Sequence, residues 1–173
     1  VRTAYRQGTM IMTIKRKPET CRCVECGSPK VWRGYVVRWF RTVPIGRNPV
    51  ELEARIPRLA CQDCGTTRQA AIGFAEPRRT YTKSFERYAL ELSRFMTIKD
   101  VACHLGVSWD VVKDIQKRYL QRRFARPKLK HLKRIAIDEI STASGHTYAT
   151  IVLDLDRGAV VYVGDGKGAD ALL

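Results

Sequence analysis

The stretch Arg134-Ile-Ala-Ile-Asp138-Glu139 decides how the C-terminal part of the chain is organised. Its apolar residues predict a short strand, and an aspartate at the end of a strand is held rigidly where a metal ion can reach it. The following run, Thr147 to Val163, predicts two more strands joined by a tight turn, and Ala169 opens the first turn of a helix. A metal-dependent nuclease-type site needs several carboxylates, so this stretch supplies the beginning of such a site.

The charge of the chain is unevenly distributed around a net value of +15. Residues 1–80 carry 16 Lys and Arg against 6 Asp and Glu, and residues 81–134 carry 14 against 5. Residues 135–173 carry 2 against 6. Basic residues up to position 134 followed by an acidic C-terminal part suit a protein that binds a polyanion and presents metal-binding carboxylates to it.

Composition excludes several classes of protein. The chain has no apolar run of about eighteen residues, so it has no predicted membrane span. Its first residues lack the apolar core of a signal peptide and do not begin with Met, which predicts a cytoplasmic protein whose start lies upstream. In the cytoplasm the six cysteines are expected to be reduced. Their spacing is therefore compared with that of metal ligands before disulfide bonds are considered.

Two Cys-x-x-Cys-Gly knuckles predict a zinc ribbon over residues 21–76. The knuckles are Cys23-Val-Glu-Cys26-Gly and Cys61-Gln-Asp-Cys64-Gly. Their four thiolates would give a closed tetrahedral zinc site, which is structural and not catalytic. Cys21 is left out, because its one-residue gap to Cys23 suits a shared ion less well. The alternative is four free or disulfide-bonded cysteines.

The residues around the knuckles predict strands. Val31–Phe40 and Val50–Ile56 have strand patterns, with the turn between them at Gly46–Pro49. Residues 1–20 are interpreted as a basic lead-in with a short strand at Thr9–Ile14. A ribbon of this size buries too little surface to fold without its ion.

Residues 80–130 predict a helix-turn-helix. Thr97 can cap a helix that Gly106 ends, and Ser108 can cap the next one. Cys103 is predicted to be a small buried hydrophobe. An upstream helix, Ser84–Met96, carries an apolar stripe made of Phe85, Tyr88, Ala89, Leu92 and either Phe95 or Met96. The motif's own apolar positions are Ile98, Val101, Ala102, Leu105, Val111, Val112 and Ile115.

The second helix of this motif would lie in the major groove of DNA. Lys113 and Gln116 are positioned to contact base edges. The full predicted set of DNA-contacting residues is Ser108, Trp109, Asp110, Lys113, Gln116, Lys117, Arg118, Arg122 and Arg123. The last four would lie along phosphates, within a basic run that continues to Arg134. The alternative is a helical hairpin that serves only for packing.

Taken in order, these modules resemble the transposases of the ISL-three type of bacterial insertion sequence. The most specific phrases are Ile137-Asp138-Glu139 and Gly145-His-Thr-Tyr-Ala-Thr150, and the first knuckle also fits. The resemblance covers about Cys23 to Leu173. The expected fold class is therefore α+β with several modules: a zinc ribbon, a helix-turn-helix, and over residues 131–173 the first three strands of a ribonuclease-H-like α/β domain.

The resemblance implies a catalytic Asp-Asp-Glu triad around two Mg²⁺ ions. Only Asp138 matches it, as catalytic residue and magnesium ligand, and the second aspartate and the glutamate are expected beyond Leu173. The fragment would then bind DNA without the full triad. The implied partner is double-stranded DNA at the terminal inverted repeats of the element. The implied setting is the bacterial nucleoid, with a homo-oligomer forming on the DNA.

Other polar residues in this stretch have simpler interpretations. Turn chemistry accounts for Asp156 and largely for Asp154, although Asp154 could also lie near the metal as a strand neighbour of Asp138. Glu139 is expected on the opposite face from Asp138, because side chains alternate along a strand. His146 is expected at a turn or the surface, and Gly166-Lys-Gly168 is too short for a phosphate-binding loop.

Two other functions remain open from the sequence. The first is a non-enzymatic DNA-binding regulator or a decayed transposase remnant. The second is a zinc-stabilised protein-interaction module, which leaves the uneven charge unexplained. In a full-length protein, replacing Asp138 by Ala separates the transposase from the regulator, because cleavage should vanish while DNA binding survives.

Overall fold

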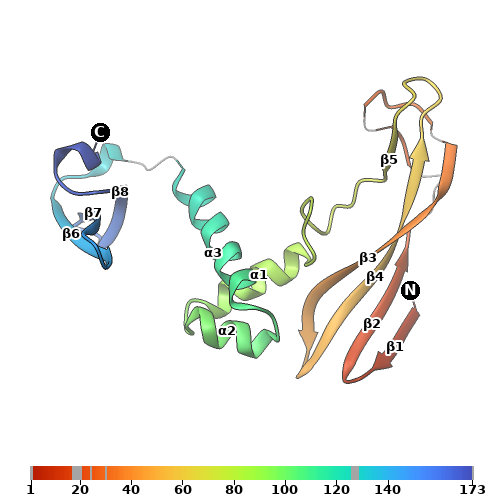
Figure 1. Cartoon of the computed structure of the whole chain (residues 1–173), viewed down its shortest axis with the longest axis horizontal. Coiled ribbons are helices and arrows are strands. Elements are labelled where there is room, and N and C mark those ends of the chain that lie inside the picture. Colours follow the sequence, from red (N-terminus) through yellow and green to blue (C-terminus); the bar gives the residue numbers. More distant parts are fainter. Residues whose placement is uncertain (1, 17–20, 24, 30, 126–128, 173) are drawn as a thin grey trace. The chain divides into compact units, whose positions relative to one another are not determined.

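The computed structural model describes residues 2–16, 21–23, 25–29, 31–125 and 129–172. The chain divides into two compact units, Val1–Gln116 and Lys117–Leu173, and helix α3 spans the division (Figure 1).

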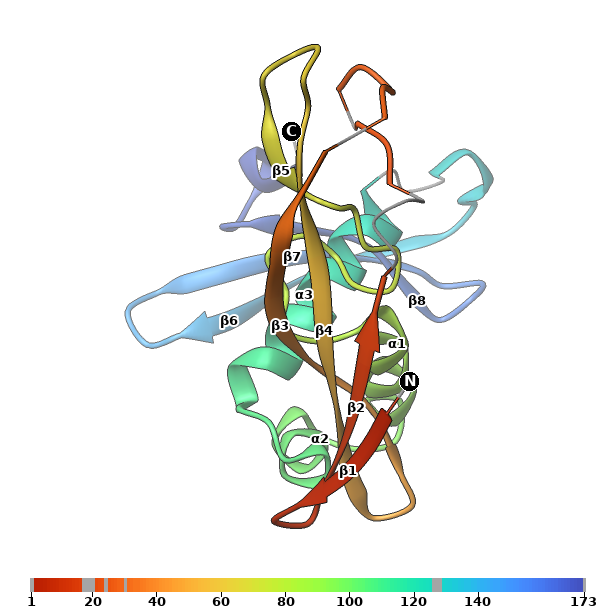
Figure 2. The same cartoon turned by 90° about the vertical axis from the view of Figure 1, so that its right-hand side faces the viewer.

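The first unit contains a five-stranded sheet (Figures 1 and 2). Its strands are β1 (Arg2–Arg6), β2 (Thr9–Lys15), β3 (Val31–Ile45), β4 (Asn48–Ala60) and β5 (Thr67–Gln69). The order is β1-β2-β4-β3, and β5 also pairs with β4. Strands β2 and β4 are parallel, and the other pairs are antiparallel. The two strands predicted between the knuckles are present and longer than expected, and β1 was not predicted.

One face of this sheet forms a core beneath the segment that leads to the helices. Phe40, Ala54 and Ile56 are buried on alternate positions of β3 and β4, as strand geometry requires. The ring of Phe74 packs edge-on against Phe40 with centroids 5.2 Å apart. Cys21 is buried in the same core, which explains why it does not join the other cysteines.

Three helices follow: α1 (Lys83–Leu92), α2 (Ile98–Leu105) and α3 (Trp109–Phe124). Their buried core comprises Tyr81, Phe85, Ala89, Val101, Ala102, Leu105, Val112 and Ile115, most of which were predicted. The apolar stripe of the upstream helix ends on Met96, which packs against this core, and not on Phe95, whose side chain is 84% exposed. The burial predicted for Cys103 was wrong, since it is exposed on α2.

The ends of α2 have the predicted caps. The Thr97 hydroxyl oxygen accepts a hydrogen bond from the Asp100 backbone N–H at 3.2 Å, and its own proton goes to the Asp100 carboxylate at 2.6 Å. Gly106 ends the helix in the left-handed conformation with φ 61°, which a glycine adopts without steric cost. Val107 then packs against the helical core.

Strand β3 joins the sheet to the helices within the first unit. The Arg41 backbone N–H donates to the Thr80 carbonyl at 2.7 Å, and the Arg41 carbonyl accepts from the Thr82 N–H at 2.9 Å. The Arg41 side chain donates to the Leu105 carbonyl at the end of α2 at 2.9 Å and pairs with Glu51 at 3.5 Å. Because α2 ends there, Arg41 satisfies a carbonyl that the helix itself leaves unpaired.

The second unit holds a three-stranded antiparallel sheet. Strands β6 (Ile135–Ala143), β7 (Thr147–Asp154) and β8 (Ala159–Asp165) lie in the order β6-β7-β8, flanked by the 3₁₀ turns η2 (Leu129–His131) and η3 (Ala169–Leu172). The three predicted strands are therefore present. A meander of this kind occurs in many folds, so the ribonuclease-H-like assignment stays a prediction.

The two faces of this sheet differ. Thr150, Val152 and Asp154 alternate along β7 and are buried. The segment after β8 folds over that face, where the Thr150 hydroxyl donates to the Gly166 carbonyl at 3.1 Å and the Tyr162 hydroxyl to the Ala171 carbonyl at 3.0 Å. The register pairs Asp138 with Ile151, which places Asp138 on the other face.

Candidate metal centre and nucleic-acid interface

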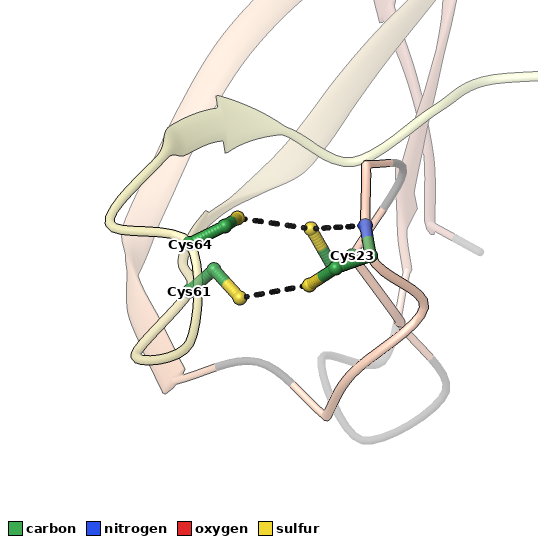
Figure 3. A group of neighbouring side chains, drawn as sticks. Cys23, Cys61 and Cys64 are labelled. Atoms are coloured by element: carbon green, nitrogen blue, oxygen red, sulfur yellow. Dashed lines mark hydrogen bonds between the residues drawn. The ribbon is translucent and has the colours of Figure 1, made fainter.

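The two knuckles bring four cysteine sulfurs together. Cys23, Cys26, Cys61 and Cys64 each offer a sulfur, and these atoms all lie within 4.8 Å of one another. The Cys23–Cys64 and Cys26–Cys61 sulfurs are 3.7 and 3.4 Å apart. Figure 3 shows Cys61 and Cys64, which follow β4, facing Cys23 across the gap.

Hydrogen-bond donors that favour a thiolate surround the sulfurs of Cys23 and Cys64. The backbone N–H groups of Glu25 and Cys26 donate to the Cys23 sulfur at 3.3 and 3.4 Å. The Thr66 hydroxyl lies 3.1 Å from the Cys64 sulfur, and the Thr66 side chain and then its backbone N–H lower the pKa of the Cys64 thiol. For Cys61, a backbone hydrogen bond from Cys64 lowers the pKa, but burial and the neighbouring sulfurs outweigh it and raise the pKa to about 11.

These residues fit a zinc ion. A tetrahedral site with Zn–S bonds near 2.3 Å requires neighbouring sulfurs about 3.8 Å apart, which is close to the two measured separations. Soft sulfur donors with backbone N–H groups around them are the ligand set of structural zinc sites. The signal for Thr66 was available in the sequence, since it follows Cys64-Gly65 directly, but it was not predicted.

Helix α3 presents most of the residues predicted to contact DNA. The exposed ones are Ser108, Trp109, Asp110, Lys113, Lys117, Arg122 and Arg123, and Gln116 and Arg118 are half-buried. Opposite Lys113 and Lys117, Val112 and Ile115 are fully buried in the helical core. The first half of the helix therefore separates a packing face from a polar face. Arg126 and Lys128 of the predicted basic run lie outside the described residues.

Two contacts fix side chains on α3. The ammonium of Lys113 lies 4.6 Å from the ring centroid of Trp109, a cation–π contact at the start of the helix. Asp114 accepts a hydrogen bond from the Tyr81 hydroxyl at 3.2 Å and pairs with Arg79 at 3.1 Å. Asp114 therefore anchors α3 to the chain before α1, a role that sequence reasoning missed because Tyr81 and Arg79 are distant in sequence.

Asp138 lies on an exposed part of β6. Its side chain is exposed and accepts a hydrogen bond from the Glu139 backbone N–H at 2.8 Å. Glu139 lies on the opposite face, as predicted, and accepts from the Gly168 N–H at 2.7 Å. Among the described residues, the group of potential ligands that could hold a metal is the four cysteines and does not include Asp138.

The possibility that Asp154 lies beside Asp138 is contradicted by the register. Asp154 pairs with Ile135, three positions before Asp138, and so lies on the other face of the sheet. Its carboxylate is buried, accepts from the Asp156 backbone N–H at 3.0 Å and lies 3.8 Å from Arg157. These contacts close the β7–β8 turn, which is the alternative that turn chemistry predicted.

Within the described ranges, the structure has no helix that is long and apolar enough to cross a membrane.

Comparison with known proteins supports the helix-turn-helix. Residues 70–120 match the family model for the helix-turn-helix domain of transposase family ISL3. This range covers the segment leading to the helices, α1, α2 and most of α3.

Curated relatives extend the match along nearly the whole chain. The transposase for insertion sequence element IS1001 of Bordetella parapertussis is 25% identical over 163 residues, which is 94% of this chain and 40% of the relative. The transposase for IS1557 of Mycobacterium tuberculosis is 33% identical over 151 residues, 84% of this chain and 33% of the relative. No solved structure matches. The family model and these relatives support an ISL3-type transposase family for the chain, which spans between a third and two fifths of the length of the curated relatives it matches.

Proposed function

We propose that this chain is the DNA-recognition part of an ISL3-type transposase and that α3 contacts the terminal repeats of its element. The observation that carries the proposal is the first half of α3, which exposes Lys113 and Lys117 on one face while Val112 and Ile115 are buried on the other. Arg122 and Arg123 are exposed further along the helix. Recognition helices of this motif contact bases through their N-terminal half and phosphates beyond it. The excess of basic residues in the first 134 positions supports a polyanionic partner.

The four cysteines would hold one structural zinc ion. Cys23, Cys26, Cys61 and Cys64 would supply the thiolates, and zinc would clamp the two knuckles at the far end of the β3–β4 hairpin from its turn. Because a closed four-sulfur site leaves no position for substrate, its contribution is to folding.

Asp138 would supply one ligand to catalytic Mg²⁺ in a protein of the relatives' full length. Mg²⁺ would stabilise the charge that develops on the attacking and leaving oxygens during DNA strand cleavage and transfer. An exposed strand-borne carboxylate suits that role, and Asp138 joins no group of three or more potential metal ligands among the described residues, so its partners would come from elsewhere in the longer protein. A non-enzymatic regulator is the alternative.

Asp138→Ala separates these two readings in a protein extended to the relatives' length. A transposase loses Mg²⁺-dependent cleavage of its element's ends and keeps its affinity for them. Cleavage that persists in the variant would remove Asp138 from the site, and a wild-type protein that binds without cleaving would favour the regulator.

DNA recognition is tested on the chain itself. A labelled duplex is first selected by the wild-type chain from a random-sequence pool. Lys113→Ala and Gln116→Ala should each weaken binding to that duplex by about 1–3 kcal/mol and relax the sequence preference at the contacted base pairs. Arg87→Ala, an exposed cation on α1, serves as the control and should leave the preference unchanged. An unaltered preference in both α3 variants would refute base reading by this helix.

A further inference from the structure

The end of the five-stranded sheet next to the helices carries two tight turns. Gln7 and Gly8 join β1 to β2, and Gly46 and Arg47 join β3 to β4. Because β2 runs parallel to β4, with Met10 opposite Val50, both turns lie at the same end of the sheet. Figures 1 and 2 both show them side by side at that end. With strands about 4.8 Å apart, the turn centres are separated by about 10 Å.

The backbone of these turns leaves their side chains free to face outward. Gln7 and Gly8 both have positive φ, 46° and 76°, and Gly46 has φ 60°. Positive φ at the first central position is what two-residue hairpin turns of the primed types require. The glycine at position 46 meets that requirement, so position 47 can carry any side chain, and here it carries an arginine.

Two exposed arginines flank this end without acidic partners. Arg6 ends β1 and Arg47 lies in the β3–β4 turn, and both are exposed. In the part of the chain that the structure describes, neither forms an ion pair. The nearest acidic residue in sequence to Arg47, Glu51, is paired with Arg41. The end of the sheet therefore presents net positive charge that the fold itself does not neutralise.

The same end of the sheet lies beside the turn of the helix-turn-helix. The Arg41 side chain donates to the Leu105 carbonyl at 2.9 Å. A Cβ placed on Gly106 would lie 3.2 Å from the Arg41 guanidinium. From Arg41 the strand continues four residues to Ile45, which is about 13 Å. Trp109, the first residue of α3, follows Gly106 by three positions. The β3–β4 turn thus lies about 13 Å along the strand from the residue that contacts the turn before α3.

We propose that these two turns form a second DNA contact, in which Arg6 and Arg47 bind backbone phosphates of the duplex next to the site that α3 reads. This inference rests on the proposed DNA binding by α3. Arginine on a rigid hairpin suits phosphate, because its planar fork donates two parallel hydrogen bonds and keeps its charge. The contact would add affinity and fix orientation without reading sequence.

The test compares two double variants of equal charge. Arg6→Ala/Arg47→Ala removes the turn arginines, and Arg33→Ala/Arg58→Ala removes two exposed arginines from the knuckle end of the same sheet. The probe is the duplex that the wild-type chain selects from a random pool, titrated across a range of salt. The turn variant should reduce the slope of log affinity against log salt by about 1.8, as expected for two lost phosphate contacts.

A hydroxyl-radical footprint supplies the second readout. In the turn variant, protection should disappear from backbone positions beside the α3 site while protection over the site persists, and the knuckle-end variant should keep both. An unchanged slope and footprint in the turn variant would overturn the inference, as would an equal loss in the knuckle-end variant. A wild-type chain that binds no duplex, or is insensitive to Lys113→Ala and Gln116→Ala, would instead refute the proposed function on which it rests.

Discussion

Single residues next to the cysteine sulfurs decide how well the knuckles can hold a metal. Ser28 and Thr66 occupy equivalent places after their Cys-x-x-Cys-Gly motifs, with hydroxyls 3.5 and 3.1 Å from the sulfurs of Cys26 and Cys64. Each also closes its knuckle through its backbone carbonyl, which accepts from Cys23 and Cys61 at 2.9 Å. The repeated pattern shows that the knuckles are matched halves of one site.

Thr66→Val should weaken zinc binding by about tenfold, a typical cost for losing a group that supports a ligand. The substitution keeps the side-chain shape but removes the hydroxyl that, together with the backbone N–H, lowers the pKa of the Cys64 thiol. A higher pKa leaves a larger fraction of the Cys64 thiol protonated at a given pH, so zinc must displace that proton more often when it binds. The deficit should therefore grow as pH falls and shrink as pH rises.

Competition with a coloured chelator across a pH series measures this effect. Thr67→Val, at an exposed neighbouring position on β5, is the matched control and should bind zinc like the wild type. Equal affinities for the two variants at every pH would mean that the Thr66 hydroxyl does not support the site.

At the scale of elements, sequence reasoning succeeded where the signal is local. The caps at Thr97 and Gly106, the apolar stripes of α2 and α3, and the paired cysteines each depend on residues a few positions apart. It failed where the partner is remote. Strand β1 is exposed along its length and has no buried face to set a pattern, and the pairing of β2 with β4 joins segments about forty residues apart. Phe95 is exposed because α1 ends at Leu92, before the helical period reaches it.

The contact of Arg41 on β3 with the end of α2 could not be predicted from the sequence either, because the residues are distant in sequence. Substituting Arg41 tests this contact. Arg41→Ala should lower the free energy of unfolding of the first unit by about 1–3 kcal/mol, because the Leu105 carbonyl loses its donor and Glu51 loses its cation. Tryptophan fluorescence during urea unfolding is a specific readout, since all three tryptophans, Trp32, Trp39 and Trp109, lie in that unit.

The control for this contact is Arg55→Ala. Arg55 also pairs with a glutamate, Glu53 at 3.4 Å, but its side chain is 52% exposed and touches no helix end in the described structure. An exposed pair of this kind contributes little, so the variant should unfold within about 0.5 kcal/mol of the wild type. Equal stabilities of the two variants would show that Arg41 does not tie the sheet to the helices.

At the scale of the whole molecule, the change of charge falls inside the second unit and not at the boundary between Gln116 and Lys117. The basic excess ends at Arg134, where the acidic strands of the second unit begin at Ile135. The family could be predicted because short phrases carry it. The catalytic assembly could not, because Asp138 is the one residue predicted for the triad, and it joins no group of three or more potential metal ligands among the described residues.

This division predicts that salt dependence is set by the basic part alone. Arg122→Ala/Arg123→Ala should reduce the slope of log affinity against log salt by about 1.8, because each lost phosphate contact releases about 0.9 fewer counterions. Both residues are exposed near the end of α3, so the substitution should leave the helical core intact. The reverse change in the acidic part, Asp165→Ala/Asp170→Ala, also alters the net charge by two but removes no predicted DNA contact. Its slope should equal that of the wild type, since the slope counts the phosphate contacts and none is lost. Fluorescence anisotropy titrations of the selected duplex at several salt concentrations measure both slopes. If the two variants changed the slope equally, net charge and not placed contacts would control binding, and the assignment of Arg122 and Arg123 to phosphates would fail.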